Sequence, residues 1–349
     1  MKIDWAIKAE GKDVTENFRP YLVSISVKDE AKDEADSCTI VLDNSSTQLQ
    51  PPVQGDELEI FLGYVGALAS VGKYTVDKAS FTGPPDTLTI QCKSAAFVTT
   101  DISQTFKDQK KRSWEPSNVF DIATKIAAEH GMELVTSEPA VLKAVVTPHL
   151  DQDGETDLSF LSARIDLRGW FVKVANGTLI LDRKSKGLTV NAKTGERIPP
   201  VVLHRTDVSS YSGEWSERAV FDKAIAQWHN AETGETMYET AGTGNRVWRF
   251  KPYAPDQKTA QDWAREKIAR STGTGGKMSM SMAGRTDLQA EQLITCEGFP
   301  YPLSVTPTKS AIAKQWVIKS VELSLSSGGF TTSISGDPYI PPPEPVKNG

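Results

Sequence analysis

Alternation of apolar and polar residues over residues 213–300 and 316–337 limits what this chain can fold into more than any other feature. Met278, Met280 and Met282 alternate with serines, and the later stretch largely alternates valines and leucines with polar residues. A period of two places one set of side chains on a buried face and the other set in water. The pattern therefore predicts β-strands, each half-buried.

Two turn signals and one helix interrupt these strands. Residues 233–235 and 327–329 each contain glycine between strand-like runs, which is typical of a β-hairpin. Residues 256–271 predict a helix, because Ala260, Trp263 and Ile268 fall on one face and Gly273 follows as a stop signal. The region thus reads as a β-rich domain, residues 196–337, with one inserted helix.

The first part of the chain, residues 1–110, also predicts short strands. Candidates are residues 21–27, 37–43, 58–63, 74–77 and 87–92, with a Gly-Pro-Pro turn at 83–86. In the first of these, Val23, Ile25 and Val27 share one face. Short strands at this spacing favour a small barrel or a sandwich.

Between the β-rich regions, residues 111–195 predict a small α+β unit. Helices are expected at residues 116–130 and 157–168, each followed by glycine, and a hairpin is expected around Asn176-Gly177. Residues 184–200 are polar and end in proline, as a linker does. The fold class is therefore mainly β with an α+β insert.

Residues 338–349 form a proline-rich tail that cannot continue a sheet. Consecutive prolines favour the extended polyproline geometry. Two interpretations stay open for this tail. It is either a frayed chain end or an arm that lies on a neighbouring subunit.

Length and charge narrow the classes of function. A chain of 349 residues has room for two or three domains, and its net charge of −6 argues against a protein that grips nucleic acid. No apolar run is long enough to span a bilayer, and the N-terminus lacks the apolar core of a signal peptide. We expect a chain that is made in the cytoplasm and does not insert into a membrane. Cys38, Cys92 and Cys296 lie far apart in strand-like runs, which predicts buried, reduced thiols.

The acidic run at residues 151–157 is the most tempting ligand site. Its four carboxylates suggest calcium, but an EF-hand loop needs glycine sixth and glutamate twelfth, where this run has Gly154 fourth and Ser162 twelfth. The favoured interpretation is that Glu155, Thr156 and Asp157 begin the following helix.

Other motifs of chemistry also fail. Residues 271–278 lack the first glycine and the final Ser/Thr of a phosphate-binding loop, and Gly242-Thr-Gly244 lacks the third glycine of a dinucleotide fingerprint. The histidines at 130, 149, 204 and 229 show no metal-ligand spacing, and no GxSxG motif occurs. We predict no catalytic, cofactor-binding or metal-binding residue and no cofactor. A glycosidase, which needs only two carboxylates, is unsupported by the sequence but not excluded by it.

Several motifs, in order over most of the chain, resemble the phage late control D protein family, the baseplate hub of contractile-tailed phages and tailocins. The motifs that carry the resemblance are Gly55-Asp-Glu-Leu, Gly72-Lys-Tyr-Thr-Val-Asp-Lys, Gly83-Pro-Pro, Ile126-Ala-Ala-Glu-His-Gly131, Glu155-Thr-Asp-Leu-Ser-Phe-Leu161, Gln227-Trp228, Gly284-Arg-Thr-Asp-Leu288, Trp316-Val-Ile and Gly328-Gly-Phe-Thr-Thr332. The family is also similar to the hub part of type VI secretion spike proteins.

The resemblance implies two barrel domains of the tail-tube kind in each subunit and a homotrimer with six barrels in a ring. Such a ring would join the six-fold tail tube to the three-fold membrane-piercing spike, in a phage virion or tailocin particle assembled in the host cytoplasm. Its expected partners are the tube protein, the spike protein and other baseplate or tape-measure proteins, with DNA passing through and not held. The expected role is structural and non-enzymatic. The alternatives are a cell-wall or polysaccharide hydrolase of the tail tip and a sugar-binding module.

Overall fold

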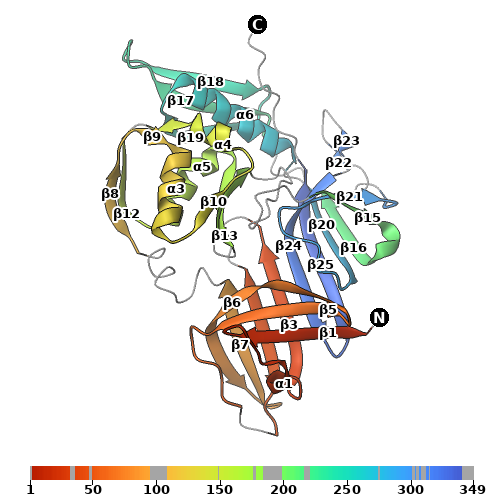
Figure 1. Ribbon diagram of the computed structural model, residues 1–349. Coiled ribbons are helices and arrows are strands. Elements are labelled where there is room, and N and C mark those ends of the chain that lie inside the picture. Colours follow the sequence, from red (N-terminus) through yellow and green to blue (C-terminus); the bar gives the residue numbers. More distant parts are fainter. Residues whose placement is uncertain are drawn as a thin grey trace.

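The computed structural model describes residues 2–31, 36–46, 49–94, 108–147, 149–175, 178–183, 199–215, 221–273, 276–300, 303, 306–307, 312–313 and 315–339. Figure 1 shows a large sheet formed from both ends of the chain, a mixed α+β unit, and a smaller sheet covered by one helix. Strands dominate, as the sequence predicts.

The first part of the chain supplies one half of the large sheet. Its strands run side by side in the order β3-β4-β7-β6-β5-β1-β2. The elements are β1 (Ile3–Ala9), β2 (Lys12–Asp13), α1 (Thr15–Phe18), β3 (Leu22–Glu30), β4 (Ser37–Asp43), β5 (Glu57–Tyr64), β6 (Ala67–Thr82) and β7 (Thr87–Ser94). The predicted face is correct for Ile25 and Val27, which are buried, but wrong for Val23, which is 44% exposed. The pairing of β3 with β4 shifts register between Leu22 and Ser24, and this irregularity displaces Val23 from the buried face.

The last part of the chain supplies the other half. Strands β16, β20, β25 and β24 are neighbours in that order, and β21 pairs with both β24 and β15. The elements are β15 (Val201–His204), η3 (Arg205–Asp207), β16 (Val208–Trp215), β20 (Gly276–Ala283), β21 (Leu293–Glu297), β24 (Gln315–Ser326) and β25 (Gly329–Pro338), with a separate pair β22 (Thr306–Pro307) and β23 (Ile312–Ala313). Met278, Met280 and Met282 are all buried, as their alternation predicts.

Strand β24 joins the two halves. Its first residues pair with β21, with Val317 opposite Leu293, and its later residues pair with β3, with Ser324 opposite Ser26. The two halves therefore form one 13-stranded sheet and share one hydrophobic core. Closure into two separate barrels, which the resemblance implied, is not found among the described residues. The edge of β24 is shared between β21 and β3, and alternation along a strand cannot specify which edges pair.

The α+β unit lies beside the large sheet (Figure 1). Its elements are β8 (Lys110–Trp114), β9 (Ser117–Asn118), α3 (Val119–Glu129), β10 (Glu133–Val135), α4 (Pro139–Lys143), β11 (Val146–Thr147), β12 (Leu150–Glu155), α5 (Asp157–Ile165), η2 (Asp166–Arg168), β13 (Trp170–Ala175) and β14 (Thr178–Arg183). Helix α3 begins later than residue 116 because the Asn118 side chain caps it, accepting a hydrogen bond from Asp121 N. Gly169, with φ of 84°, follows the second helix, as expected. Residues 176–177, the expected hairpin turn, and 184–198 of the expected linker lie outside the described residues.

A smaller three-stranded sheet stands apart from the large one. It contains β17 (Lys223–His229), β18 (Thr236–Gly242) and β19 (Val247–Ala254) in the order β18-β17-β19, and helix α6 (Gln257–Gly273) packs on it. The glycine turn at residues 233–235 does connect β17 to β18, as predicted, with Gly234 N donating to Asn230 O. The inserted segment is larger than the single helix expected from the sequence, because these strands have a small core of their own.

The three cysteines are free and buried, as predicted. Burial raises the pKa values of Cys92 and Cys296 to about 12, so both remain thiols at neutral pH. Among the described residues, no helix combines the length and the apolar character needed to cross a bilayer.

Candidate functional site

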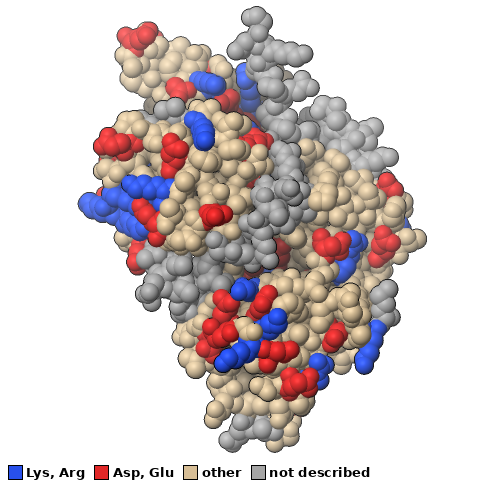
Figure 2. All heavy atoms as spheres, in the orientation of Figure 1, with Lys and Arg blue, Asp and Glu red and all other residues tan. Residues whose placement is uncertain are grey.

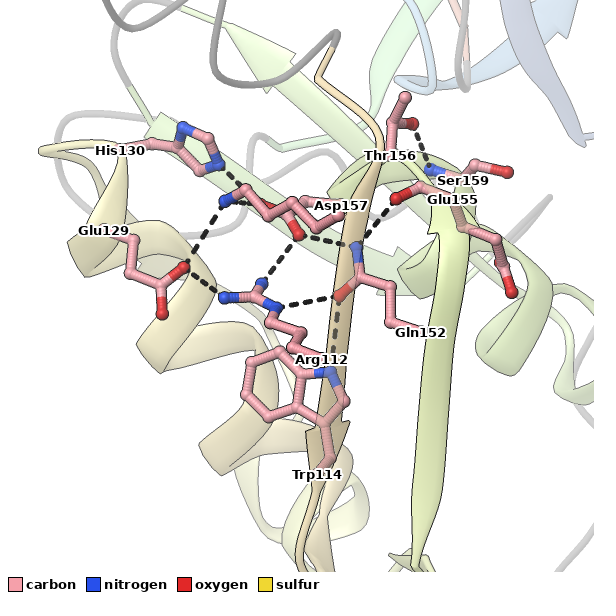
Figure 3. Close-up of polar contacts among 10 residues, drawn as sticks. Arg112, Trp114, Glu129, His130, Gln152, Glu155, Thr156, Asp157 and Ser159 are labelled. Carbon is pink, nitrogen blue, oxygen red and sulfur yellow. Dashed lines mark hydrogen bonds and ion pairs between the residues drawn. The ribbon is translucent and has the colours of Figure 1, made fainter.

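The acidic run ends at Asp157, which is fully buried at the start of α5. Thr156 caps this helix, its hydroxyl accepting a hydrogen bond from Ser159 N at 3.2 Å. This confirms that residues 155–157 begin the helix. The carboxylate of Asp157 is the centre of a polar cluster formed with β8, β12 and the end of α3 (Figure 3).

Four donors surround the two carboxylate oxygens of Asp157. Oδ2 lies 2.6 Å from Lys110 Nζ and 2.8 Å from His130 Nε2. Oδ1 accepts from Arg112 Nη2 at 2.7 Å and from Gln152 Nε2 at 2.9 Å. An ionised carboxylate has about four lone-pair sites, so its accepting capacity is filled.

A second layer of contacts orients these donors. Arg112 also bonds Glu129 and the side-chain oxygen of Gln152, and its guanidinium lies 4.3 Å from the centroid of the Trp114 ring. Trp114 Nε1 donates to Gln152 Oε1 at 3.3 Å (Figure 3). The cluster therefore joins strands β8 and β12 to helices α3 and α5 through charged and neutral hydrogen bonds.

Two opposing effects act on the pKa of Asp157. Burial by itself raises it, but hydrogen bonds from His130, Lys110 and Gln152 and the charge of Arg112 outweigh burial. The pKa is held well below its ordinary range. A carboxylate with filled lone pairs and a low pKa is a weak base, so this arrangement favours a structural role over proton transfer.

The rest of the acidic run does not assemble a ligand site. Asp151 and Asp153 are exposed and lie on β12 opposite Ser113 and Lys111. Among the described residues, no group of three or more His, Cys, Asp or Glu side chains is arranged to hold a metal ion.

The four histidines are dispersed over different elements. His130 joins the Asp157 cluster, His149 lies 3.3 Å from Asp151, and His204 lies 3.4 Å from Glu297. His229 is exposed at the end of β17. Of the failed phosphate-loop candidate, residues 274–275 lie outside the described residues.

The glycines of the dinucleotide candidate serve the turn before β19. Gly242 and Gly244 both have positive φ and lie against Asp222, where a side chain on either would collide. Their glycine identity is explained by the backbone geometry.

A second buried cluster, not predicted from the sequence, lies where the α+β unit meets the large sheet. Lys173 Nζ lies 2.8 Å from Asp29 Oδ1, 2.9 Å from Asp36 Oδ1 and 2.7 Å from Glu30 O. The backbone N–H of Ala290 donates to Asp29 Oδ2 at 2.8 Å. Only a three-dimensional arrangement reveals this cluster, because its members come from distant parts of the chain.

A third contact explains one of the motif glycines. A Cβ atom on Gly284 would lie 2.0 Å from Cδ1 of Phe330, so only glycine lets that ring pack against the backbone. Gly284 N donates to Phe330 O at 2.8 Å, and Tyr64 Oη donates to Gly284 O at 3.0 Å. Gly284 therefore fixes β5 of the first half of the sheet against the second half.

Charged side chains on the surface are mixed. Figure 2 shows Lys and Arg interspersed with Asp and Glu over the visible face of the described residues. This face presents no continuous basic stripe of the kind that tracks a nucleic-acid backbone.

Comparison with known proteins agrees with this architecture. The chain is 26% identical to the probable baseplate hub protein of Escherichia phage P2, over 95% of this chain and 92% of that protein. Its structure is similar to that of a 43 kDa tail protein of prophage MuSo2 from Shewanella oneidensis, with a TM-score of 0.69, 15% identity, and coverage of 96% and 98% of the two chains.

A further structural likeness is to an Escherichia coli component of the type VI secretion system, with a TM-score of 0.55, 12% identity, and coverage of 98% of this chain and 81% of that one. Residues 17–329 match the family described as phage tail baseplate hub (GPD). The match covers most of the sequence and includes strands from both halves of the large sheet. The chain therefore belongs to the phage tail baseplate hub family.

Proposed function

We propose that this hub protein forms a homotrimer whose ring joins a hexameric tail tube to a trimeric membrane-piercing spike. The observation that carries the proposal is the pairing of β24 with β3, which sets the two β-rich regions side by side in one sheet. Two neighbouring β units in each of three subunits provide six positions around a ring. Each subunit contact in such a ring is heterologous and closes after three copies.

The ring would work in a phage virion or a tailocin particle that is assembled in the host cytoplasm. Its partners are then the tube protein above, the spike below, and other baseplate or tape-measure proteins. The likeness to a type VI secretion component supports this arrangement at the level of fold. The proposed domains are residues 1–110 and 196–337 as tube-like units, residues 111–195 as the α+β unit, and residues 338–349 as the tail.

We assign the chain a structural, non-catalytic role. The buried carboxylate of Asp157 accepts four hydrogen bonds and has a lowered pKa, which suits a fixed cross-link between elements. The net charge of −6 is compatible with a channel through which DNA passes without being held.

Light scattering of the purified chain, alone and mixed with its spike, tests the proposal. The expected result is a mass near three times the chain mass of 38.1 kDa, or a complex of three hubs with three spike chains. A chain that stays monomeric at micromolar concentration and ignores the spike contradicts the proposal. A parallel assay of peptidoglycan turnover and a glycan array test the hydrolase and sugar-binding alternatives.

A further inference from the structure

The smaller sheet carries helix α6 on one face and exposes aromatic residues on the other. Tyr238 of β18 and Tyr253 of β19 both lie opposite Gln227 of β17, so the three side chains form one row across the sheet. The alternate residues Ala224 and Ala226 are buried against α6, which means that the row faces away from the helix. Tyr238 is 61% exposed and Tyr253 is 56% exposed.

The spacing of this tyrosine row fits a polyproline helix. Strands lie about 4.8 Å apart, so tyrosines on the two outer strands are about 9.6 Å apart across the sheet. A polyproline helix repeats every three residues, or about 9.3 Å, and aromatic side chains at such intervals are the usual receptors for it. The central Gln227 is held in place, because its Nε2 donates to Lys251 O at 3.0 Å.

We propose that the tyrosine row binds the proline-rich tail of a second copy of this chain. In the tail, Pro342 and Pro345 are three residues apart and so share one face of a polyproline helix. Glu344 lies between them, and the sheet offers a positive charge in the adjacent row at the exposed Arg249. Each proline ring packs on one tyrosine. The inference deepens the proposed homotrimer, on which it rests for the presence of a neighbouring copy.

The described chain ends beside the C-terminal end of α6. Tyr339 N donates to Gln315 O at 3.1 Å, at the end of β25. The end of β25 pairs with the start of β20, where Gly336 lies opposite Met278. Strand β20 begins at Gly276, three residues along the chain from Gly273, the last residue of α6. The tail therefore leaves the sheet near this end of the helix.

The tyrosine row lies toward the other end of α6, on the opposite face of the small sheet. Glu239, the neighbour of Tyr238, accepts hydrogen bonds from Gln257 and Gln261 in the first half of the helix. From Gln261 to the end of α6 is about 18 Å, at about 1.5 Å per residue. Passing from the helix layer to the far face of the sheet adds roughly 10 Å.

The tail of the same chain is too short for this path. Pro345 lies six residues beyond Tyr339, so it reaches about 19 Å in polyproline geometry and Pro342 reaches about 9 Å. The route to the tyrosine row is roughly 28 Å. The tail of a second copy starts from a different position and is not restricted by this route. We therefore assign the tail that binds the tyrosine row to a neighbouring subunit.

Photocross-linking of the full chain tests the assignment. A benzoylphenylalanine replaces Pro343, a position that the three-residue repeat of a polyproline helix would place off the Pro342–Pro345 face. The irradiated protein is then separated by mass. The expected product is a covalent dimer in which the tail is joined to a peptide containing Tyr238 or Tyr253. Cross-linking within a single chain contradicts the assignment to a second copy, and a chain that forms oligomers without any cross-link to this sheet overturns the proposal.

Binding of a synthetic peptide separates this inference from the question of the trimer. A labelled peptide of residues 337–349 is titrated into the full chain at a concentration where light scattering reports monomer. We expect Y238A and Y253A each to weaken binding about tenfold or more, since hot-spot aromatic residues dominate such contacts. Phe81→Ala, which removes a 55% exposed aromatic residue from the large sheet, should leave binding unchanged.

Two peptide controls complete this test. A peptide with alanine at both 342 and 345 should lose binding, whereas alanine at 343 should have a smaller effect. The proposal fails if the unmodified peptide does not bind the monomeric chain, or if it binds Y238A and Y253A as well as the wild type. That conclusion holds whether or not the chain forms a trimer at higher concentration. If the chain is a monomer and the peptide binds the tyrosine row, the face is confirmed and the homotrimer is not.

Discussion

The Nζ atom of Lys173 lies 2.8 Å from Oδ1 of Asp29, and this ion pair fixes the α+β unit to the large sheet. The same ammonium group bonds Asp36, and Asp29 accepts a further hydrogen bond from Ala290 N. Strand β3, strand β13 and the segment before β21 therefore meet at one lysine.

Replacing Lys173 with methionine should destabilise this junction. The variant leaves the carboxylates of Asp29 and Asp36 facing each other without their shared cation, and removing one partner of a buried ion pair costs about 3–5 kcal/mol. Scanning calorimetry is the suitable measurement, because a chain with several cores need not unfold in one step. K111M is the matched control, since Lys111 and Asp153 form a pair that is 86% and 72% exposed and should contribute below about 1 kcal/mol. If K173M and K111M had the same unfolding temperatures, Lys173 would not stabilise the contact between the α+β unit and the large sheet.

Asp36 should make the stability of the protein depend on pH. Burial and then the charge of Asp29 raise the pKa of Asp36, Lys173 opposes both, and the resulting pKa is about 7. The folded state then holds a proton more tightly than the unfolded chain, whose value is 3.8. The stability that protonated Asp36 contributes is full below pH 4 and is lost as the pH rises through about 7.

The pKa shift of Asp29 makes stability depend on pH in the opposite direction, but over a different range of pH. Burial by itself raises the pKa of Asp29, but the charge and the hydrogen bond of Lys173 outweigh burial, so the net shift is downward. The stability that ionised Asp29 contributes is therefore present above pH 4 and is lost only on further acidification. Between pH 4.5 and 7.5, the difference in stability between the wild type and Asp36→Asn therefore reports on Asp36. We expect the free energy of unfolding of the wild type, measured by denaturant titration, to fall across this range relative to Asp36→Asn by about 3 kcal/mol. If the free energy of unfolding depended on pH in the same way in the wild type and in Asp36→Asn, Asp36 would not be the titrating group.

The Asp157 cluster should respond to the loss of one charge. In Asp157→Asn, Lys110 and Arg112 remain cationic and lose the buried carboxylate between them, keeping only the half-exposed Glu129. In addition, the amide NH₂ group of the new side chain meets hydrogen-bond donors. A cost of about 3 kcal/mol is expected, confined to the α+β unit. Hydrogen exchange should show faster exchange in α3 and α5 than in the strands of the large sheet.

The matched control for this variant is Asp151→Asn, because the Asp151 side chain is 68% exposed. It should leave exchange unchanged. If the purified wild type hydrolyses peptidoglycan, and Asp157→Asn abolishes that activity without altering exchange, Asp157 has a catalytic role and the structural assignment is wrong.

Local features of the sequence predicted local structure well. The methionine alternation specified the buried face of β20, and Thr156 marked the start of α5 because a cap depends on residues within one turn. The late start of α3 at Val119 shows the limit of such reasoning. Pro116 is a good first-turn residue, but Asn118 supplies the actual cap hydrogen bond.

Long-range relationships could not be predicted from the same patterns. The alternation in β24 fixed which side chains are buried but not that Ser324 would lie opposite Ser26, almost the whole chain away. The resemblance implies two closed barrels, whereas the described strands pair into one 13-stranded sheet in which closure is not found. The Lys173 cluster was missed for the same reason, because no spacing in sequence relates Lys173 to Asp29.

Gly284 offers a test of the packing between the two halves of the large sheet. Alanine at this position places its Cβ about 2 Å from the Phe330 ring, so the ring or the backbone must move, and overpacking of this kind costs about 1–3 kcal/mol. The shift should also weaken the hydrogen bond from Tyr64 Oη to Gly284 O, which crosses from one half of the sheet to the other. Calorimetry of Gly284→Ala should show a lower temperature for the unfolding transition of the large sheet.

Gly328→Ala is the control, because the nearest heavy atom to a Cβ there is Ser326 Oγ at 3.5 Å and the backbone is not left-handed. It should be nearly neutral. The decisive comparison is the double variant Gly284→Ala with Phe330→Ala. Removing the ring removes the collision, so the double variant should lose less stability than the sum of the two single variants. Additive losses would mean that Gly284 is required for some reason other than its contact with Phe330.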